Sequence, residues 1–354
     1  MSRATQRAAV IGAGMIAKEH LGALAETPGV EVVGVCDLSP VMAESTADRF
    51  GVKHWTTDYR QLLDEQRPDV VHVTTPAASH FAIARDCLEA GASVLVEKPI
   101  TLTLGEFETL NALAESNGLW LLEDHNYRFN TDIAQLLADR DNGELGEVRF
   151  VEVRVHLDLF GEGSRFADRD APHPAMREPL GAVSDFLTHL AYLAHTFIGP
   201  HQSVATVAHR LRPECPGAIS EFQALIQAGN ASGLLALSTE GCTDGFWVRV
   251  EGTKKRVEVN LFEVGSVTTA DLGGPQPLLP LRNMRRRASD ERRNSLRSFS
   301  RKLSGGPGAY EGLWSLVKQT YAARTAGGPP PISPQTVREV NQLVHAVSQS
   351  GVAT

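Results

Sequence analysis

Asp185 and His189 are two residues whose types and spacing could transfer a proton. They lie in residues 183–197, which we predict to be helical, and residues four apart share one face of a helix. A histidine titrates near neutral pH and can take the proton of an alcohol, while a carboxylate beside it orients the imidazole or the substrate. Taken alone, such a pair is more often a surface ion pair or a histidine satisfied within the core.

Lys98 is a second candidate because of its position after a strand. The apolar run Ser93–Val96 predicts a short buried strand, and Glu97, Lys98 and Pro99 follow it directly. Open α/β sheets bind their ligands at the carboxyl ends of the strands. A lysine at that place could hold a substrate hydroxyl and favour its deprotonation, although a lysine after a strand is more commonly a surface residue.

A glycine-rich turn near the amino terminus indicates a site for a dinucleotide. The pattern G-x-G-x-x-G/A is fulfilled by Gly12, Ala13, Gly14, Met15, Ile16 and Ala17. The turn follows a strand-like run and opens a helix, as that pattern requires. Gly12 makes the tight turn, Gly14 lets the backbone approach a pyrophosphate, and the small Ala17 lets helix and strand pack closely. The N–H groups at the helix amino terminus would bind the diphosphate.

Asp37 adds a ribose-binding carboxylate to this turn. It ends the apolar run Val30–Cys36 and stands 23 positions after Gly14, close to the roughly 20 expected for such a residue. A carboxylate there accepts hydrogen bonds from both ribose hydroxyls and repels a 2′-phosphate. No arginine or lysine follows immediately, so we expect NAD, with NADP as the less favoured cofactor. The alternative is a solvated turn residue.

The elements that must position these residues form two patterns. In residues 1–125, short apolar runs alternate with helical stretches, which is typical of βαβ units and a parallel sheet. The predicted strands are 8–11, 30–36, 69–73, 93–96 and 119–122, and the predicted helices are 15–26, 40–49, 79–90 and 104–116. This half is predicted to be a Rossmann-type, doubly wound α/β domain.

The remainder, residues 126–354, is predicted to be an α+β domain with a largely antiparallel open sheet. Its strand-like runs alternate between apolar and polar residues, as in a sheet with one wet face. These runs are 148–155, 204–211, 221–227, 234–239 and 246–259, and the helical stretches are 183–197, 309–326 and 334–348. The C-terminal helix could pack back on the first domain.

Length and composition limit the classes of protein to which this chain can belong. A length of 354 residues suggests two domains, and a net charge of −8 argues against a general nucleic-acid binder. The four cysteines show no zinc spacing, and we predict no metal site. The start lacks the apolar core of a signal peptide, and no apolar run approaches the ~20 residues that cross a bilayer. We therefore expect a cytoplasmic protein without a membrane span.

One segment is strongly basic, although the chain as a whole is acidic. Residues 282–302 contain nine basic and two acidic residues, a local net charge of +7 that leaves −15 for the rest of the chain. Apolar residues recur there at spacings of three and four, which predicts an amphipathic helix. A solvated or subunit-contacting insertion is the ordinary interpretation. The alternative is an anionic partner: a sugar nucleotide's diphosphate, a phosphorylated lipid carrier or a membrane surface.

Taken together, these motifs resemble the glucose–fructose oxidoreductase/inositol dehydrogenase (Gfo/Idh/MocA) family. The glycine turn, Asp37 and the Glu97-Lys98-Pro99 element carry the resemblance, and the last is the most specific. Other matching stretches are 75–80, 126–130, 145–148 and 181–189. The resemblance implies NAD(P)-dependent oxidation or reduction of a sugar, polyol or sugar nucleotide, and a homo-oligomer (dimer or tetramer) formed through the C-terminal sheet.

The resemblance also implies roles for single residues. Lys98 polarises the reacting hydroxyl, His189 is the acid/base, and Asp185 positions the substrate or the imidazole. The expected cofactor-binding residues are Gly12, Gly14, Met15, Ile16, Ala17, Asp37, Thr75, Pro76, His80, Glu97, Lys98 and Asn126. The expected substrate-binding residues are Lys98, Tyr127, Arg128, His173, Arg177, Asp185 and His189. His173 and Arg177 come from a polar stretch just before the helix, which is also typical of a plain connecting loop.

Two departures from the family pattern lie beside the substrate region. Pro179-Leu180-Gly181 stands where a run of glycines is usual, and Tyr192 stands where many members carry an aspartate. Two alternatives to a dehydrogenase also remain. One is a glycoside-cleaving enzyme that works by transient oxidation and elimination, and the other is a catalytically silent NAD-binding sensor.

Overall fold

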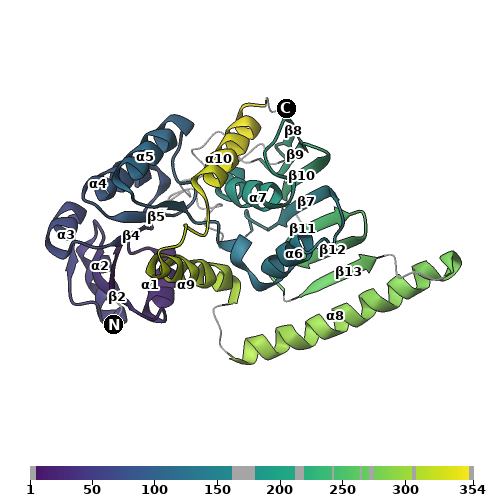
Figure 1. Ribbon diagram of the computed structural model, residues 1–354, viewed down its shortest axis with the longest axis horizontal. Helices are drawn as coiled ribbons and strands as arrows, with labels where there is room; N and C mark the ends of the chain where they lie inside the picture. The colour runs from purple at the N-terminus through teal and green to yellow at the C-terminus, as the bar shows by residue number, and fades with distance from the viewer. Residues whose placement is uncertain are drawn as a thin grey trace. The chain divides into compact units, whose positions relative to one another are not determined.

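The computed structural model describes residues 5–161, 180–211, 219–240, 243–263, 265–270, 275–304 and 308–350 (Figure 1). The chain divides into two compact units. The first comprises Met1–Phe129 and Tyr310–Arg338, and the second comprises Asn130–Ala309 and Glu339–Thr354. Residues 310–338 belong to the first compact unit although they follow the second unit in the sequence, and their helix packs on the first helix of the chain.

The first unit contains a parallel sheet whose described strands lie in the order β3-β2-β1-β4-β5-β6. The strands are β1 (Gln6–Ile11), β2 (Val30–Cys36), β3 (Trp55–Thr56), β4 (Val70–Val73), β5 (Ser93–Val96) and β6 (Leu121–Glu123). This is the strand order of dinucleotide-binding folds, and it confirms the predicted fold class. β4 and β5 are buried along their whole length because helices cover both faces of the sheet.

Several helices of this unit begin at a side-chain cap, whereas others, the first among them, have none within the described residues. The helices are α1 (Met15–Ala25), α2 (Pro40–Phe50), α3 (Tyr59–Gln66), α4 (His80–Glu89), α5 (Leu104–Asn117) and α9 (Glu311–Ala326), with the short 3₁₀ turns η1 (Ala77–Ser79) and η2 (Asn126–Phe129). A further 3₁₀ turn, η5 (Gly308–Tyr310), begins in the second unit and enters this one at Tyr310. The Ser39 hydroxyl caps α2, and Thr103 with Glu106 forms a capping box on α5. Gly51 and Gly118 end these helices in the left-handed conformation.

The turn after β1 requires a glycine for two reasons. Gly12 has φ +99°, and a Cβ atom on it would lie 2.8 Å from the carbonyl carbon of Thr74. The Thr74 hydroxyl in turn donates to the Gly12 carbonyl at 2.7 Å, and the Gly12 N–H donates to Cys36 O at 2.7 Å. The ends of β1, β2 and β4 are therefore joined at this turn.

Helix α9 completes the first unit by packing on α1. Gly22 permits the close approach, because a Cβ there would lie 2.9 Å from the Trp314 ring. The Trp314 indole N–H donates to Glu19 at 3.3 Å. α9 also carries Tyr321, which is 1% exposed and points into the interior of the unit.

Tyr321 begins a chain of buried polar contacts that crosses the core. Its hydroxyl lies 3.0 Å from His72 Nε2, and His72 Nδ1 lies 2.8 Å from His20 Nδ1. His20 Nε2 then lies 3.1 Å from Glu97 Oε1. Both imidazoles are fully buried. The chain joins α9, β4, α1 and the residue that follows β5.

The proton positions in this chain follow from burial. Burial, and next the neighbouring His20, hold the pKa of His72 well below its usual value, so its imidazole is neutral. Burial raises the pKa of Tyr321, so its hydroxyl keeps its proton. His20 Nε2 donates to the Glu97 carboxylate, and a single proton lies between the Nδ1 atoms of His20 and His72. Each of the four groups therefore has a hydrogen-bond partner within the chain.

The second unit contains a mixed sheet with the described strand order β13-β12-β11-β7-β10-β9-β8. Its strands are β7 (Val148–His156), β8 (Ser203–His209), β9 (Glu221–Ala228), β10 (Ala231–Ser238), β11 (Gly245–Gly252), β12 (Lys255–Asn260) and β13 (Ser266–Ala270). β10 pairs with β7 in parallel, and the other described pairs are antiparallel. The prediction of a largely antiparallel sheet is confirmed.

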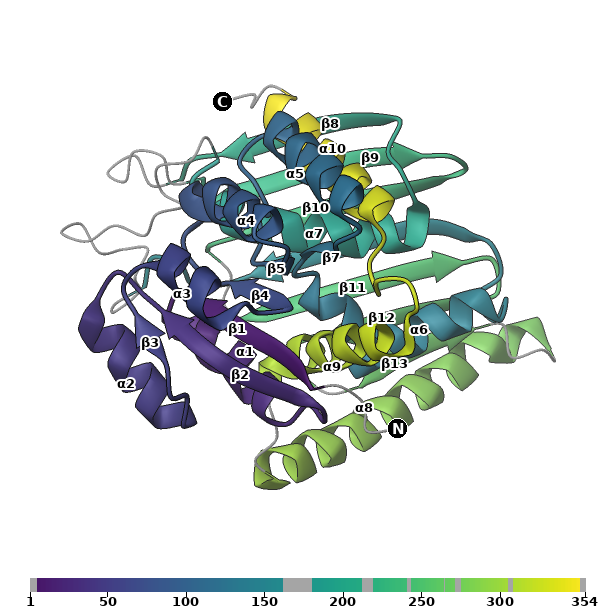
Figure 2. The ribbon, with the colours of Figure 1, turned by 60° about the vertical axis from the view of Figure 1, so that its left-hand side comes forward.

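Buried and exposed residues alternate along these strands, as in β9, because helices cover one face of the sheet. The helices are α6 (Thr131–Asp141), α7 (Ala182–Ile198), η4 (Gln276–Leu278), α8 (Leu279–Ser304) and α10 (Pro334–Gln349), whose residues up to Arg338 belong to the first unit. α7 packs on β7 and β10. Figure 2 shows α7 against the sheet, and α8 following its edge along β13. No helix within the described residues is long and apolar enough to span a bilayer.

The geometry of Gly12 predicts a large loss of stability in Gly12→Ala. The positive φ and the contact with Thr74 should together lower the free energy of unfolding by about 2–4 kcal/mol. Gly14→Ala is the matched control, since its φ is −69° and its Cβ would meet open space, and we expect a change below about 1 kcal/mol. Urea unfolding measures the free energy of unfolding of each variant. Equal losses in the two variants would refute the special requirement for glycine at position 12.

Burial of His72 predicts a specific pH dependence of stability. The unfolded chain binds a proton on this histidine near pH 6.5 while the native protein does not, so stability falls as the pH drops below that value. The loss from this one group approaches about 1.4 kcal/mol per pH unit. His72→Gln keeps hydrogen-bonding groups, removes the titration and should flatten the dependence between pH 6.5 and 5, whereas the half-exposed control His54→Gln should not. If the free energy of unfolding changes equally steeply with pH in the wild type and in His72→Gln, then His72 takes up the proton in the native protein.

Candidate functional site

The glycine turn and Asp37 meet at the carboxyl edge of the parallel sheet. The Ala13 N–H donates to Asp37 Oδ2 at 2.7 Å, and the Ser39 N–H donates to Asp37 Oδ1 at 2.8 Å. Asp37 is half-buried, and each of its oxygens has a second lone pair for a hydroxyl donor. The structure therefore brings together two sequence-predicted parts of the dinucleotide site.

The amino terminus of α1 fits a diphosphate. Gly14 is its N-cap, with no side-chain cap among the described residues and no acidic residue in the first turn. A Cβ at Gly14 would meet nothing within 4 Å, so the backbone is open to a ligand on that side. Met15 is exposed, Ile16 is half-buried, and Ala17 is fully buried against the sheet. The residues present therefore fit the cofactor that the motif predicts.

His80 ties together the turns that follow β4 and β5. Its Nε2 lies 2.7 Å from Thr75 O and its Nδ1 lies 2.8 Å from Pro99 O, and the side chain is 1% exposed. Both partners are backbone carbonyl oxygens, so the imidazole links the two turns. Thr75 is half-buried and Pro76 is exposed at the same edge. The contacts give His80 a positioning role, and its binding of the cofactor stays a prediction.

Glu97 is a buried carboxylate next to Lys98. Its Oε2 accepts the Lys98 N–H at 3.2 Å, and its side chain is also hydrogen-bonded to Asp124, which follows β6. Burial alone would raise the pKa of Glu97, but the hydrogen bond and charge of His20, with the nearby Lys98, lower it to about 2. Burial and the Glu97 charge raise the pKa of Asp124 well above its usual range. One carboxylate and one carboxylic acid therefore lie side by side, and the carboxylate accepts the backbone N–H of Lys98.

The same cluster has a spacing that a cation could use, since ligand atoms of His20, Glu97 and Asp124 lie within 4.8 Å of one another. The sequence analysis predicted no metal. Asp124 Oδ1 has no hydrogen-bond partner among the described residues, while His20 and Asp124 both bond to Glu97. A proton shared by Glu97 and Asp124 would hold the two carboxyl groups close together. The absence of a metal stays a prediction.

The predicted residues Asn126, Tyr127 and Arg128 belong to the 3₁₀ turn η2, which follows β6 after Asp124 and His125. Asn126 is buried and its Oδ1 accepts the Tyr127 N–H at 2.9 Å, while Tyr127 and Arg128 are half-buried. η2 packs on α9 within the first unit. These residues follow β6 at the same sheet edge as Glu97.

His189 and Asp185 belong to the second unit, on α7. His189 is 8% exposed, and its Nδ1 lies 3.0 Å from the Tyr192 hydroxyl with the two rings edge to face. Asp185 is half-buried in the first turn of the same helix. When the Tyr192 hydroxyl accepts Nδ1–H, the lone pair of the imidazole is on Nε2, as a general base requires. His173 and Arg177 lie outside the described residues.

Four side chains that support these groups were not identified from the sequence: His20, His72, Tyr321 and Asp124. Asp124 had a readable signal, because it follows a strand that ends at the same sheet edge as Glu97. His20 falls among the buried positions of α1, where a polar residue needs a partner. Tyr192 was noted as a departure from the family pattern, and the structure shows it bonded to His189.

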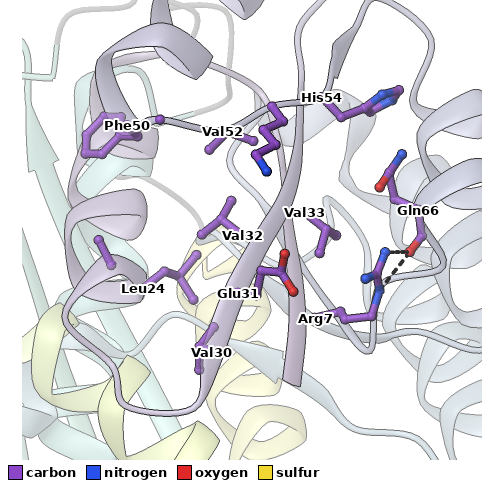
Figure 3. A pocket seen from close by; sticks show the side chains of 13 residues that line it. Arg7, Leu24, Val30, Glu31, Val32, Val33, Phe50, Val52, His54 and Gln66 are labelled. Atoms are coloured by element: carbon purple, nitrogen blue, oxygen red, sulfur yellow. Dashed lines mark hydrogen bonds between the residues drawn. The ribbon is translucent and has the colours of Figure 1, made fainter. Parts of the chain in front are cut away.

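Within the part of the chain that the structure describes, a pocket of about 470 Å³ lies away from all of these residues (Figure 3). It is lined by the amino-terminal parts of β1 and β2 together with residues 50–54, so it opens at the opposite edge of the sheet from the glycine turn. The Arg7 guanidinium on its wall donates to the Gln66 carbonyl. Ligands of this fold class bind at the carboxyl edge, so we do not assign this pocket to the active site.

Comparisons with known proteins show that the chain is similar in sequence to oxidoreductases. The chain is 33% identical over 214 residues to the uncharacterized oxidoreductase YdgJ of Escherichia coli, a match that covers 58% of each protein. It is 33% identical over 156 residues to D-glucoside 3-dehydrogenase of Escherichia coli, covering 44% of each. The chain thus matches less than two thirds of the length of these curated relatives.

Solved structures show the fold over the whole chain. A levoglucosan dehydrogenase, determined with NADH and levoglucosan, has a TM-score of 0.77 at 19% identity and covers 98% of this chain and 96% of its own. Two family models also match. The one described as an oxidoreductase family with an NAD-binding Rossmann fold matches residues 6–125, and the one for the C-terminal alpha/beta domain of the same family matches residues 141–313. The chain therefore belongs to the Gfo/Idh/MocA family of NAD-binding oxidoreductases.

Proposed function

We propose that this protein is an NAD-dependent dehydrogenase that oxidises a secondary hydroxyl of a sugar, polyol or sugar nucleotide. The observation that carries the proposal is the position of Lys98, which follows β5 at the sheet edge where the Gly12–Ala17 turn follows β1. A cofactor on the glycine turn and a hydroxyl on Lys98 would share that edge. D-glucoside 3-dehydrogenase, a relative of this chain, supports the choice of a carbohydrate substrate.

Gly12, Gly14 and the first turn of α1 would hold the diphosphate, and Asp37 would accept hydrogen bonds from the ribose hydroxyls. When bound, NAD⁺ supplies a hydride acceptor at C4 of its nicotinamide ring. The negative charge of Asp37 at this place disfavours a 2′-phosphate, so we propose NAD in preference to NADP.

The protein's own part in the reaction is the handling of one proton. We propose that the Lys98 ammonium donates a hydrogen bond to the reacting hydroxyl oxygen and stabilises negative charge as it develops there. His189 Nε2 takes the hydroxyl proton, and Asp185 orients the substrate or the imidazole. The anionic Glu97 favours the charged form of Lys98, since the two residues are adjacent and the carboxylate is buried.

The open face of the seven-stranded sheet supports the proposal of a homo-oligomer. Leu225 and Val207 are about half exposed there, and the Arg154 guanidinium lies 4.7 Å from the centroid of Trp247. Aromatic and arginine side chains with exposed leucine are typical of protein interfaces. We propose that subunits associate through this face.

The proposed chemistry predicts that Lys98→Ala and His189→Ala each lose at least ~10²-fold in turnover while NAD binding is kept. The wild type is first screened for NADH formation over inositols, free sugars, sugar phosphates and UDP-sugars. The exposed lysine variant Lys53→Ala serves as a control and should keep wild-type turnover.

Unchanged turnover in either variant would refute the role of that residue. Cleavage of a glycoside with no net NADH would favour the elimination mechanism instead. NAD binding without turnover on any of these substrates would favour a silent sensor.

We predict that Asp37→Asn changes the cofactor preference. The amide keeps an acceptor for the backbone of the glycine turn but removes the charge that repels a 2′-phosphate, so we expect the NAD:NADP ratio of kcat/KM to fall about tenfold. Asp48→Asn, on the exposed surface of α2, should leave the ratio unchanged. A wild-type preference for NADP, or a ratio unaffected by Asp37→Asn, would contradict the assignment.

A further inference from the structure

Helix α8 places its polar residues, rather than its apolar ones, against the protein. Asn283 exchanges two hydrogen bonds with the backbone of Ala270, donating from Nδ2 at 3.0 Å and accepting at Oδ1 at 3.1 Å. Asp290, which is 7% exposed, accepts the Thr268 N–H at 3.2 Å, and Asn294 donates to Ser266 O at 3.0 Å. The three side chains recur every seven or four residues, so they form one face of the helix, which satisfies alternate residues of the edge strand β13.

The apolar residues of α8 lie on the opposite face. Leu281 is 47% exposed, Met284 is 58%, Leu296 is 66% and Phe299 is 67%. Leu281, Met284 and Ala288 follow one another at spacings of three and four, and Leu296 and Phe299 continue the same stripe two turns later. Figures 1 and 2 both show α8 as a long straight helix along β13, which is the strand that its polar face bonds. Over 26 residues it is roughly 39 Å long.

The charge on α8 identifies the kind of partner that this stripe fits. Seven arginines stand between residues 282 and 297, and all except Arg286 are exposed. Arg285 and Arg292 interrupt the stripe itself, and the others flank it. Arginine binds phosphate oxygens through paired N–H groups, and its long stem can lie along apolar surface. Apolar side chains bordered by arginines match the boundary between lipid headgroups and acyl chains.

A second copy of the chain fits this face less well. A contact between two α8 helices related by a two-fold axis would bring the two arginine clusters together. The segment 282–302 has a net charge of +7, whereas the rest of the chain carries −15. An anionic surface would attract the helix and repel the remainder, so the charge distribution favours contact through α8 alone.

We propose that the outer face of α8 docks on an anionic lipid surface, with Leu281, Met284, Leu296 and Phe299 entering the headgroup–acyl boundary and the arginines contacting phosphate. The helix lies in the plane of the surface and does not cross it. This inference does not depend on the proposed dehydrogenase activity, since β13 and α8 hold none of the residues assigned to it.

The test is flotation of the full-length protein with vesicles. We expect at least tenfold more binding to vesicles of equal parts phosphatidylglycerol and phosphatidylcholine than to phosphatidylcholine alone. This difference should fall steeply between 50 mM and 500 mM salt, because the arginine contacts are screened. The variant Leu296→Ser/Phe299→Ser should lose at least about tenfold in vesicle binding, and Arg285→Gln/Arg292→Gln, which removes two of the seven arginines, should weaken both the binding and its salt dependence.

Two controls separate this surface from others. Leu102→Ser removes a leucine of the first unit that is 53% exposed, and Arg49→Gln removes an exposed arginine of α2; neither should change vesicle binding. The α8 variants leave Asn283, Asp290 and Asn294 in place, so their thermal unfolding and NAD binding should match the wild type.

Several outcomes would overturn the proposal. Equal binding to both kinds of vesicle, or none to the anionic kind, would show that the face has no affinity for an anionic lipid surface. A fall in oligomer mass by light scattering in Leu296→Ser/Phe299→Ser, with vesicle binding unchanged, would show that a second copy covers the stripe.

Discussion

A buried negative charge is the constraint on which the first unit depends. Glu97 is ionised although it is 8% exposed, and an unpartnered carboxylate at such a depth costs several kcal/mol. Its partners come from α1, from the residue after β6 and from the Lys98 backbone, and His20 is itself held by His72 and Tyr321. The same carboxylate that fixes the elements of the sheet edge also keeps a negative charge next to Lys98. Stability and the proposed chemistry therefore depend on one cluster.

Short sequence patterns predicted those parts of the first unit whose structure depends mainly on residues close together in the sequence. The glycine turn, Asp37 and the Glu97-Lys98 pair were recognised because each follows a buried strand at a defined spacing. The two-residue β3 and the helices α3 and α6 were missed. β3 and α3 are short, with two and eight residues, whereas α6 has apolar residues at helical spacing that were overlooked. Residues 246–259 were taken as one run, whereas the short turn at Thr253 and Lys254 divides them into β11 and β12.

The buried contacts behind Glu97 could not be predicted in the same way, because their partners are distant in sequence. Tyr321 is 249 residues from His72, and only the packing of α9 on α1 brings the two together. Tyr192 is a different case. Its position three residues after His189 was noted as a departure from the family, and a hydroxyl there still bonds Nδ1 while adding no second negative charge beside the proposed base.

Helix α8 shows how an edge strand can reverse the usual rule for an amphipathic helix. The sequence pattern correctly predicts a helix with one apolar stripe, and the usual expectation is that the stripe packs on the sheet. β13, however, is the last strand, and its outward N–H and C=O groups need partners that apolar side chains do not supply. Asn283, Asp290 and Asn294 supply them, which requires the polar face of the helix to point inward. The polar and apolar faces of a straight helix are fixed relative to each other. Because the polar face of α8 forms hydrogen bonds to β13, Leu296 and Phe299 must face the solvent.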